Sequence, residues 1–390
     1  MTAKTKALIA GGIALAVLVT GGIATAAIGG LPGSSTADPS ASSTPQPSES
    51  ADPTRSATEI GRAFLDDYVV DSGAAAGRVV RRDQGGDTVS EGQAYGMLVA
   101  VALGDEKTFD SIWSWTTTHL QQKDGLMAWR WDDGKIVDDE PASDADMDMT
   151  RALLLAGKTF DSATYTREGK TLGAHVLDDM TSVTPLGRIL LPGVWAQGSG
   201  PWSYNPSYAA PAAFDELAKS TGDARWSELA SGSRKVTTRI LESAALPSDW
   251  AQVKTDGTVV PLPGPTGDSG TVEYGYDAGR VAIRFAESCT PVDQKIAAKL
   301  AAPLSGKDPL PMQLDLGGTP LSQDQSPLGY VARAGALAAD GQDGAAQRDL
   351  QRADELAQST PTYYGAAWDA LGALQLQTDS LGACAPLKGQ

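Results

Sequence analysis

Residues 90–122 read SEGQAYGMLVAVALGDEKTFDSIWSWTTTHLQQ, and this stretch contains the unit that decides the fold. Its apolar residues recur at helical spacing, which predicts one helix over 90–103 and another over 105–122. Almost no connection separates the two, and short connections join antiparallel neighbours. The stretch therefore predicts a helical hairpin.

Helical spacing continues over most of the chain from Ser56 onward, whereas strand-like alternation is scarce. Twelve helices in pairs predict an all-α fold, an (α/α)6 barrel of six helical hairpins. A solenoid of hairpins is the alternative, but no fixed repeat period is present. In a closed barrel, the connections on one face would build a cleft. Besides the first pair, the expected helices cover 57–70, 144–160, 163–181, 207–220, 223–243, 276–290, 292–301, 326–339, 343–357 and 363–377.

The N-terminal segment has the pattern of export. Lys4 and Lys6 precede an uncharged apolar run over residues 7–28. Ala24-Thr25-Ala26 offers a cleavage site, but the run is also long enough to span a bilayer. We therefore expect residues 1–29 to be a signal peptide or an N-terminal membrane anchor.

The next segment, residues 30–56, is rich in Ser, Pro and Thr and has almost nothing apolar to bury, which predicts a disordered linker. Residues 57–390 then form the folded domain, which we expect outside the cytoplasm, secreted or anchored to the cell membrane. A large domain on a flexible linker suits an enzyme that acts on extracellular material. We expect a monomer.

Composition excludes several classes of function. The net charge is -17 without a basic stripe, which argues against nucleic acid as a partner. The two histidines, His119 and His175, lie outside any ligand-spaced cluster, which argues against zinc enzymes and histidine-dependent triads. Cys289 and Cys384 could pair in an oxidising compartment, but the sequence does not show that they meet. The chemistry must come mostly from carboxylates, with no metal or cofactor.

The first candidate segment is Ser90-Glu91-Gly92-Gln93-Ala94-Tyr95-Gly96-Met97. Thr88 to Glu91 fits a capping box, in which Glu91 would only bond back to its own chain. Yet Gly92 and Gly96 in the first turns of a helix each cost about 1 kcal/mol relative to Ala. They permit the close approach of a substrate or of a neighbouring helix.

The second and third segments also place aspartates where helices begin. Residues 142–149 read ASDADMDM, in which Asp144 either has a role at a site or simply follows the N-cap Ser143. A calcium loop would need Gly and Glu at its sixth and twelfth positions, and the sequence has neither. Residues 273–280 read EYGYDAGR, where Asp277 could form a structural ion pair with Arg280.

Aromatic residues form the fourth signal. Nine tryptophans against five phenylalanines is an unusual balance, and many of these aromatics fall in expected loops. Sugar rings present apolar C–H faces that stack on indole, so such residues suggest a carbohydrate ligand. About half of them could equally be core. They are Trp129, Trp131, Trp195, Trp202, Tyr204 and Tyr208.

Taken together, these segments resemble glycoside hydrolase family 8, which includes bacterial cellulases, lichenases and xylanases. The similarity runs from about residue 54 to 387. Residues 142–149, continuing through the leucines to Phe160, look like the family signature. Ser90 to Met97, Asn205-Pro206-Ser207-Tyr208 and Tyr276-Asp277-Ala278 with Arg280 occur in family order at similar separations. The resemblance implies an (α/α)6 barrel with an open cleft.

The resemblance also implies roles for individual residues. Glu91 matches the proton donor and Asp277 the general base of an inverting reaction, while Asp144 matches the carboxylate that holds the sugar in the central subsite. Arg280 matches a cleft arginine. Trp129, Tyr208, Tyr276 and Trp202 match substrate-binding or cleft-lining positions. Thr150, Arg151 and the residues after Arg280 depart from the usual pattern, which affects the substrate subsites more than the reaction.

The sequence therefore predicts an endo-β-1,4-glucanase of the cellulase type, whose partner is a polysaccharide. Inversion needs two carboxyl groups about 6.5–9.5 Å apart, one protonated and one ionised. Xylan, mixed-linkage glucan and chitosan stay open as substrates. A carbohydrate-binding barrel without catalysis is the alternative from another class, although it would have no need of both carboxylates.

Overall fold

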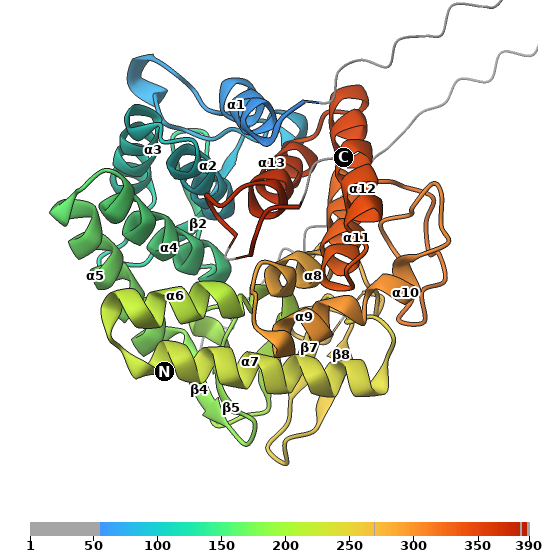
Figure 1. Cartoon of the computed structure of the whole chain (residues 1–390). Helices are drawn as coiled ribbons and strands as arrows, with labels where there is room; N and C mark the ends of the chain where they lie inside the picture. The colour runs from blue at the N-terminus through green and yellow to red at the C-terminus, as the bar shows by residue number, and fades with distance from the viewer. Residues whose placement is uncertain (1–54, 269, 383, 388–390) are drawn as a thin grey trace, which may run out of the picture. The chain divides into compact units, whose positions relative to one another are not determined.

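The computed structural model of the protein describes residues 55–268, 270–382 and 384–387 (Figure 1). The expected signal or anchor and nearly all of the expected linker lie outside these residues. Within them, Ser56 caps the first helix and Arg55 hydrogen-bonds to Asp354. Of the helices described, none combines the length and the apolar character needed to cross a membrane.

The described part of the chain is mostly helical, as predicted. All twelve expected helices are present, and the additional α10 is a single turn. The helix expected at 207 begins instead at Pro211, because proline suits the first helical position and disfavours helix in the residue before it. The helices are α1 (Ala57–Tyr68), α2 (Ser90–Ala102), α3 (Glu106–His119), α4 (Ser143–Thr159), α5 (Ala163–Asp179), α6 (Pro211–Thr221), α7 (Ala224–Ser243), α8 (Gly279–Ala286), α9 (Pro291–Ala298), α10 (Ala301–Leu304), α11 (Pro327–Ala339), α12 (Asp343–Ser359) and α13 (Tyr363–Gln377).

Three small antiparallel sheets also occur in the described residues, so the fold is mostly helical but not purely all-α as expected. Their orders are β1-β2-β3, β4-β5 and β6-β7-β8, and each sheet lies in connections between helices. Several aromatics expected in loops are strand residues instead: Trp129 and Trp131 lie in β2, and Trp202 and Tyr204 in β6. The strands are β1 (Thr88–Val89), β2 (Ala128–Asp132), β3 (Lys135–Pro141), β4 (Thr181–Thr184), β5 (Gly187–Leu190), β6 (Trp202–Tyr204), β7 (Trp250–Val253) and β8 (Val259–Leu262).

Six of the helices contact one another in a cycle. Helix α2 contacts α4, and the series continues through α6, α8, α11 and α13 back to α2. Each of α3, α5, α7, α9 and α12 packs against the member that precedes it in the chain, while α1 packs against α13 and α2 (Figure 1). The sequence accounts for this division. In α2 every residue from Gly92 to Val101 is buried, whereas α12 buries only one face.

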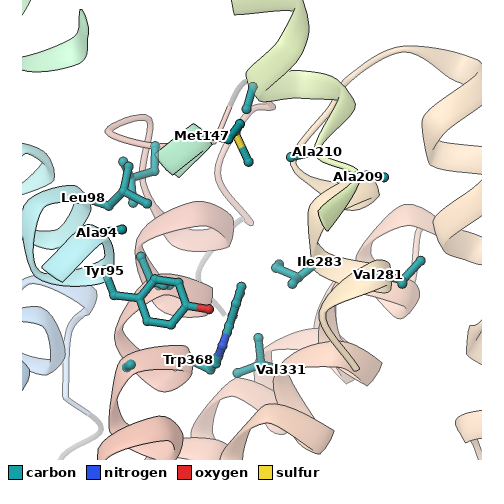
Figure 2. Packing of buried hydrophobic residues seen from close by; sticks show 14 of the residues in the cluster. Ala94, Tyr95, Leu98, Met147, Ala209, Ala210, Val281, Ile283, Val331 and Trp368 are labelled. Carbon is teal, nitrogen blue, oxygen red and sulfur yellow. The ribbon is translucent and has the colours of Figure 1, made fainter. Parts of the chain in front are cut away.

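Buried side chains from the six helices of the cycle fill its interior. Figure 2 shows Tyr95 of α2, Met147 of α4, Ile283 of α8, Val331 of α11 and Trp368 of α13 around this interior. The Tyr95 and Trp368 rings meet edge to face, with centroids 5.4 Å apart.

Glycines allow close approach at the start of α2. A Cβ atom at Gly92 would lie 2.9 Å from the Tyr363 hydroxyl of α13, and one at Gly96 would lie 3.0 Å from Ile112 of α3. Of the two explanations that the sequence left open for these glycines, a neighbouring helix therefore accounts for both.

Three buried ion pairs cross the interior between α4 and α8. In each pair the partners are 136 residues apart. A constant offset means that the two helices run in the same direction and keep one register. We call these three pairs the ion-pair ladder: Asp144 with Arg280 at 2.8 Å, Asp148 with Arg284 at 2.9 Å, and Arg151 with Glu287 at 3.0 Å.

A disulfide ties the C-terminal segment to the end of α8. Cys289 and Cys384 are bonded, with their Cα atoms 5.1 Å apart. The Arg151 guanidinium, at one end of the ladder, donates to the Leu381 carbonyl in the same segment. The sequence left this pairing open, and the structure shows that the two cysteines meet.

The ladder generates a prediction about stability. Asp148→Ala leaves the Arg284 guanidinium buried without its partner, which should lower the free energy of unfolding by about 3–5 kcal/mol. The double variant Asp148→Leu/Arg284→Met removes both charges and should recover much of that loss. Urea unfolding of the single and double variants measures the difference. Glu242→Ala in the exposed Arg239–Glu242 pair is the control, with an expected cost of about 0–1 kcal/mol. A double variant no more stable than Asp148→Ala would contradict the prediction.

The disulfide generates a second prediction. It joins residues 95 positions apart, so its loss should free a long loop in the unfolded chain and cost about 3–5 kcal/mol. Cys289→Ser/Cys384→Ser should therefore unfold at a lower urea concentration than the oxidised parent. The parent in excess reductant is the matched control and should behave like the variant. Equal midpoints for the oxidised parent and the variant would show that the bridge does not stabilise the fold.

Candidate active site

Three carboxylates from distant parts of the sequence meet at one guanidinium. Arg280 Nη1 donates to Asp144 Oδ2 at 2.8 Å and to Glu91 Oε2 at 3.3 Å. Arg280 Nη2 donates to Asp277 Oδ1. The structure therefore brings together the three carboxylates and the arginine that the sequence singled out.

The position of each carboxylate follows from where its helix begins. Glu91 and Asp144 are the second residues of α2 and α4, and Asp277 lies two residues before α8. Because all three bind Arg280, the N-terminal ends of these three helices lie at the same place. The positive end of each helix dipole therefore faces the carboxylates and favours their ionised forms.

The purely local explanations for two of these residues do not hold. The residue before α2 is Val89, no capping box forms there, and the Thr88 hydroxyl bonds to the Val79 carbonyl instead. Ser143 does not cap α4, because its hydroxyl donates to the Leu191 carbonyl. The third local explanation, an ion pair between Asp277 and its neighbour Arg280, is present.

Burial and the Arg280 charge shift the pKa of Glu91 in opposite directions. Its side chain is 15% exposed and accepts from the Tyr363 hydroxyl at 3.3 Å. Burial, with smaller contributions from the Asp144 and Asp277 charges, raises the pKa of Glu91 to about 7, although the Arg280 guanidinium opposes the rise. Glu91 can therefore hold a proton near neutral pH.

The other two carboxylates differ in exposure. Asp144 has a side chain 5% exposed, and burial raises its pKa although its bond to Arg280 acts in the opposite direction. Asp277 is the most accessible of the three, with a side chain 25% exposed. A carboxylate that reaches solvent while it is paired with an arginine is suited to receive a proton from a water molecule.

Arg280 itself is fully enclosed. The carboxylates and the tyrosines around it raise the pKa of Arg280, although burial alone would lower it. Its guanidinium carbon lies 5.3 Å from the centre of the Tyr208 ring, and Nη1 also donates to the Tyr95 hydroxyl at 3.2 Å. Tyr208 therefore lies against the arginine at the centre of the cluster.

The remaining aromatic candidates occupy other positions. Tyr276 is partly buried beside Asp277, and its ring meets the edge of Tyr364 with centroids 6.2 Å apart. Trp129 lies in β2 with the Arg130 guanidinium 6.0 Å from its ring. Trp202 is buried in β6 and donates to the Gly198 carbonyl at 2.9 Å. No hydrogen bond or ring contact joins either tryptophan to the three carboxylates in the part of the chain described.

Four residues at the site were not among the sequence candidates. Tyr95 could have been found, because it lies four residues after Glu91 and so on the same face of α2. Tyr363 and Tyr364, at the start of α13, bind Glu91 and the Tyr276 carbonyl. Asp249 accepts hydrogen bonds from the Gly275 and Ala278 amides, on either side of Asp277. Nothing in the sequence near these last three residues marks them.

Within residues 55–268, 270–382 and 384–387, no group of three or more His, Cys, Asp or Glu side chains is arranged to hold a metal ion. The chemistry that this cluster offers is that of paired carboxyl groups and an arginine.

Comparison with known proteins agrees with the geometry. The sequence model of the glycosyl hydrolases family 8 matches residues 54–378. A probable endoglucanase of Novacetimonas hansenii is 30% identical over 269 residues, which cover 66% of this chain and 76% of the relative. The match to an endoglucanase of Escherichia coli K12 is 33% identical and spans about half of each protein, 50% of this chain and 54% of the relative.

The similarity extends to a solved structure. The crystal structure of an endoglucanase from Komagataeibacter sucrofermentans has a TM-score of 0.68 to this chain at 25% sequence identity, covering 82% of this chain and 97% of the other. With the family match over most of its length, the chain belongs to glycosyl hydrolases family 8 and is a glycoside hydrolase.

Proposed function

We propose that this chain is an endo-β-1,4-glucanase that hydrolyses its substrate with inversion, with Glu91 as general acid and Asp277 as general base. One observation carries the proposal: Arg280 binds one carboxyl group that burial keeps protonated and another that stays accessible to water. The substrate class rests on the endoglucanases to which the chain is similar.

We propose further that the cycle of six helices is the inner wall of an (α/α)6 barrel. The other six long helices would form the outer wall, each paired with one inner helix. The constant register of the ion-pair ladder supports this arrangement, because inner helices of such a barrel run in one direction. The cluster at the N-terminal ends of α2, α4 and α8 would then lie at one mouth of the barrel, where an extended polysaccharide could bind across it.

The geometry is compatible with inversion. Glu91 and Asp277 bind different nitrogens of the same guanidinium, so their separation is limited by the size of that group and its two hydrogen bonds. This is compatible with the spacing of about 6.5–9.5 Å that leaves room for a water molecule. Asp277 would remove a proton from that water, while Glu91 would donate its proton to the departing glycosidic oxygen.

Asp144 and Tyr208 would act on the sugar at the point of cleavage. Asp144 is bound to Arg280 through Oδ2, and its Oδ1 accepts from the Ala145 amide, which fixes the carboxylate plane. A fixed carboxylate can accept hydrogen bonds from sugar hydroxyls and favour the distorted ring of the transition state. Trp129 and Tyr276, which are partly buried, would contribute to more distant sugar positions, whereas the buried Trp202 would support the β6-β7-β8 sheet and not stack on a sugar.

We also propose that the protein is located outside the cytoplasm. Export or anchoring by residues 1–29 would place the domain outside the cytoplasm, where polysaccharide is present. The Cys289–Cys384 disulfide is consistent with an oxidising compartment. We propose a monomer.

The catalytic assignment predicts the effect of two substitutions. Glu91→Gln and Asp277→Asn should each lower kcat on carboxymethyl cellulose by about 10²–10⁴-fold, because each removes one proton-transfer group while keeping its shape. Reducing-sugar release measures the rates, with Glu242→Gln, on the exposed face of α7, as the control at parental activity. Proton NMR of fresh product should show the α-anomer first. A β-anomer would exclude inversion, and a parent that cleaves no glucan would favour a binding protein.

The raised pKa of Glu91 predicts a pH-dependent stability. The folded protein holds the Glu91 proton up to about pH 7, whereas the unfolded chain releases it near pH 4.5. Stability is therefore lost as pH rises through this window, by about 3 kcal/mol in total. Glu91→Gln removes that loss, so its stability relative to the parent should increase between pH 5 and pH 8. Thermal unfolding at both pH values tests this, with Glu242→Gln as control. A constant difference would contradict it.

A further inference from the structure

Asp249 lies immediately before β7 and binds the segment that carries Asp277. Its Oδ1 accepts from the Gly275 amide and from the Ala278 amide, both at 2.8 Å. Its own amide donates to the Glu273 carbonyl at 2.8 Å. Three hydrogen bonds therefore join one residue of the β6-β7-β8 sheet region to the six residues before α8.

Other contacts also hold this segment, among them the bond from the Tyr364 hydroxyl to the Tyr276 carbonyl and the ion pair of Asp277 with Arg280. Tyr274 pairs with Leu314 through an isolated bridge, but Gly275 to Ala278 belong to no helix or strand. The turn leads into α8 through the bond from the Arg280 amide to the Asp277 carbonyl at 3.0 Å. The Asp249 carboxyl group thus supplies the acceptor for the Gly275 amide in the turn and for the Ala278 amide, which the start of α8 leaves without a partner in its own helix.

The fit between Asp249 and this turn is close. A Cβ atom at Gly275 would lie 2.7 Å from Asp249 Oδ2, so the carboxyl group is seated against the backbone of the turn. Asp277 and Glu273 are the charged groups that face Asp249, and both are negative. Burial, followed by the Asp277 charge, raises the pKa of Asp249 to about 8. Burying this carboxyl group beside two others costs free energy, and its two hydrogen bonds to the turn are the interactions that this placement provides.

We propose that Asp249 is a positioning residue for the general base: by binding both amides that flank Asp277, it holds the Asp277 carboxylate on Arg280 and toward the attacking water. The proposal rests on the assignment of Asp277 as base. It needs only the acceptor oxygen of Asp249, since the residue acts through the turn and not on the substrate.

Two substitutions separate this role from the alternatives. Asp249→Ala removes the acceptor and should lower kcat on carboxymethyl cellulose about 100-fold, with KM within twofold of the parent. Asp249→Asn keeps an oxygen of the same shape and should restore kcat to within about fivefold. The matched control is Asp256→Ala, in the turn between β7 and β8, where the carboxylate also accepts an amide hydrogen bond, from Thr258 at 2.8 Å. The control should retain parental kcat.

Hydrogen exchange followed by mass spectrometry gives a readout independent of activity. Amides of residues 273–281 should exchange at least tenfold faster in Asp249→Ala than in the parent, and at near-parental rates in Asp249→Asn. Both variants must first show parental circular dichroism. The proposal is overturned if folded Asp249→Ala keeps parental kcat or parental exchange, or if KM changes instead of kcat. It is also overturned if Asp249→Asn is as inactive as Asp249→Ala, because the ionisable group itself would then be required.

The experiments give a different result if the proposed glucanase function or the role of Asp277 as base is wrong. If Asp277→Asn retains parental activity, the assignment of the base is wrong, and if the parent cleaves no glucan, the proposed function is wrong. The exchange rates of residues 273–281 then still decide whether Asp249 fixes the turn.

Discussion

The bond between Arg280 and Asp144 is the interaction on which the rest of the molecule depends, because it belongs to the core and to the site at once. As one end of the ion-pair ladder, it fixes α4 and α8 in a common direction and register. As the centre of the site, the same guanidinium binds Glu91 and Asp277. Because Arg280 is buried and bonded to all three, the carboxylates are held in place before the reaction begins.

Arg280 also limits how far the pKa of Glu91 rises. Burial and the two neighbouring carboxylates raise the pKa of Glu91, and the arginine counteracts the rise. The helix dipole of α2 acts in the same direction as the arginine. The resulting pKa of about 7 is a balance in which burial outweighs both. Such a balance suits a group that must give up its proton and regain it in every cycle.

The sequence predicted the helices well, because apolar spacing over ten or more residues is a strong local signal. Glu91, Asp144, Asp277, Arg280 and Tyr208 could be selected because each stands in a recognisable segment. The short strands could not be predicted, since two to seven residues carry little periodicity. Trp129 and Trp202 could not be assigned with the same certainty as the carboxylates, because the pattern does not show which aromatic rings face a ligand.

Tyr363 was missed for a different reason: the contact it makes spans 272 residues, and a tyrosine at a helix start has many possible uses. That contact has a consequence for the order in which the site forms during synthesis of the chain. Glu91 lies at the start of the second helix, but the hydroxyl that binds it arrives with α13, the last helix described. During synthesis, the acid is therefore made early and stays without this partner until nearly the whole domain has emerged. An incomplete chain that ends before α13 is unable to assemble the site.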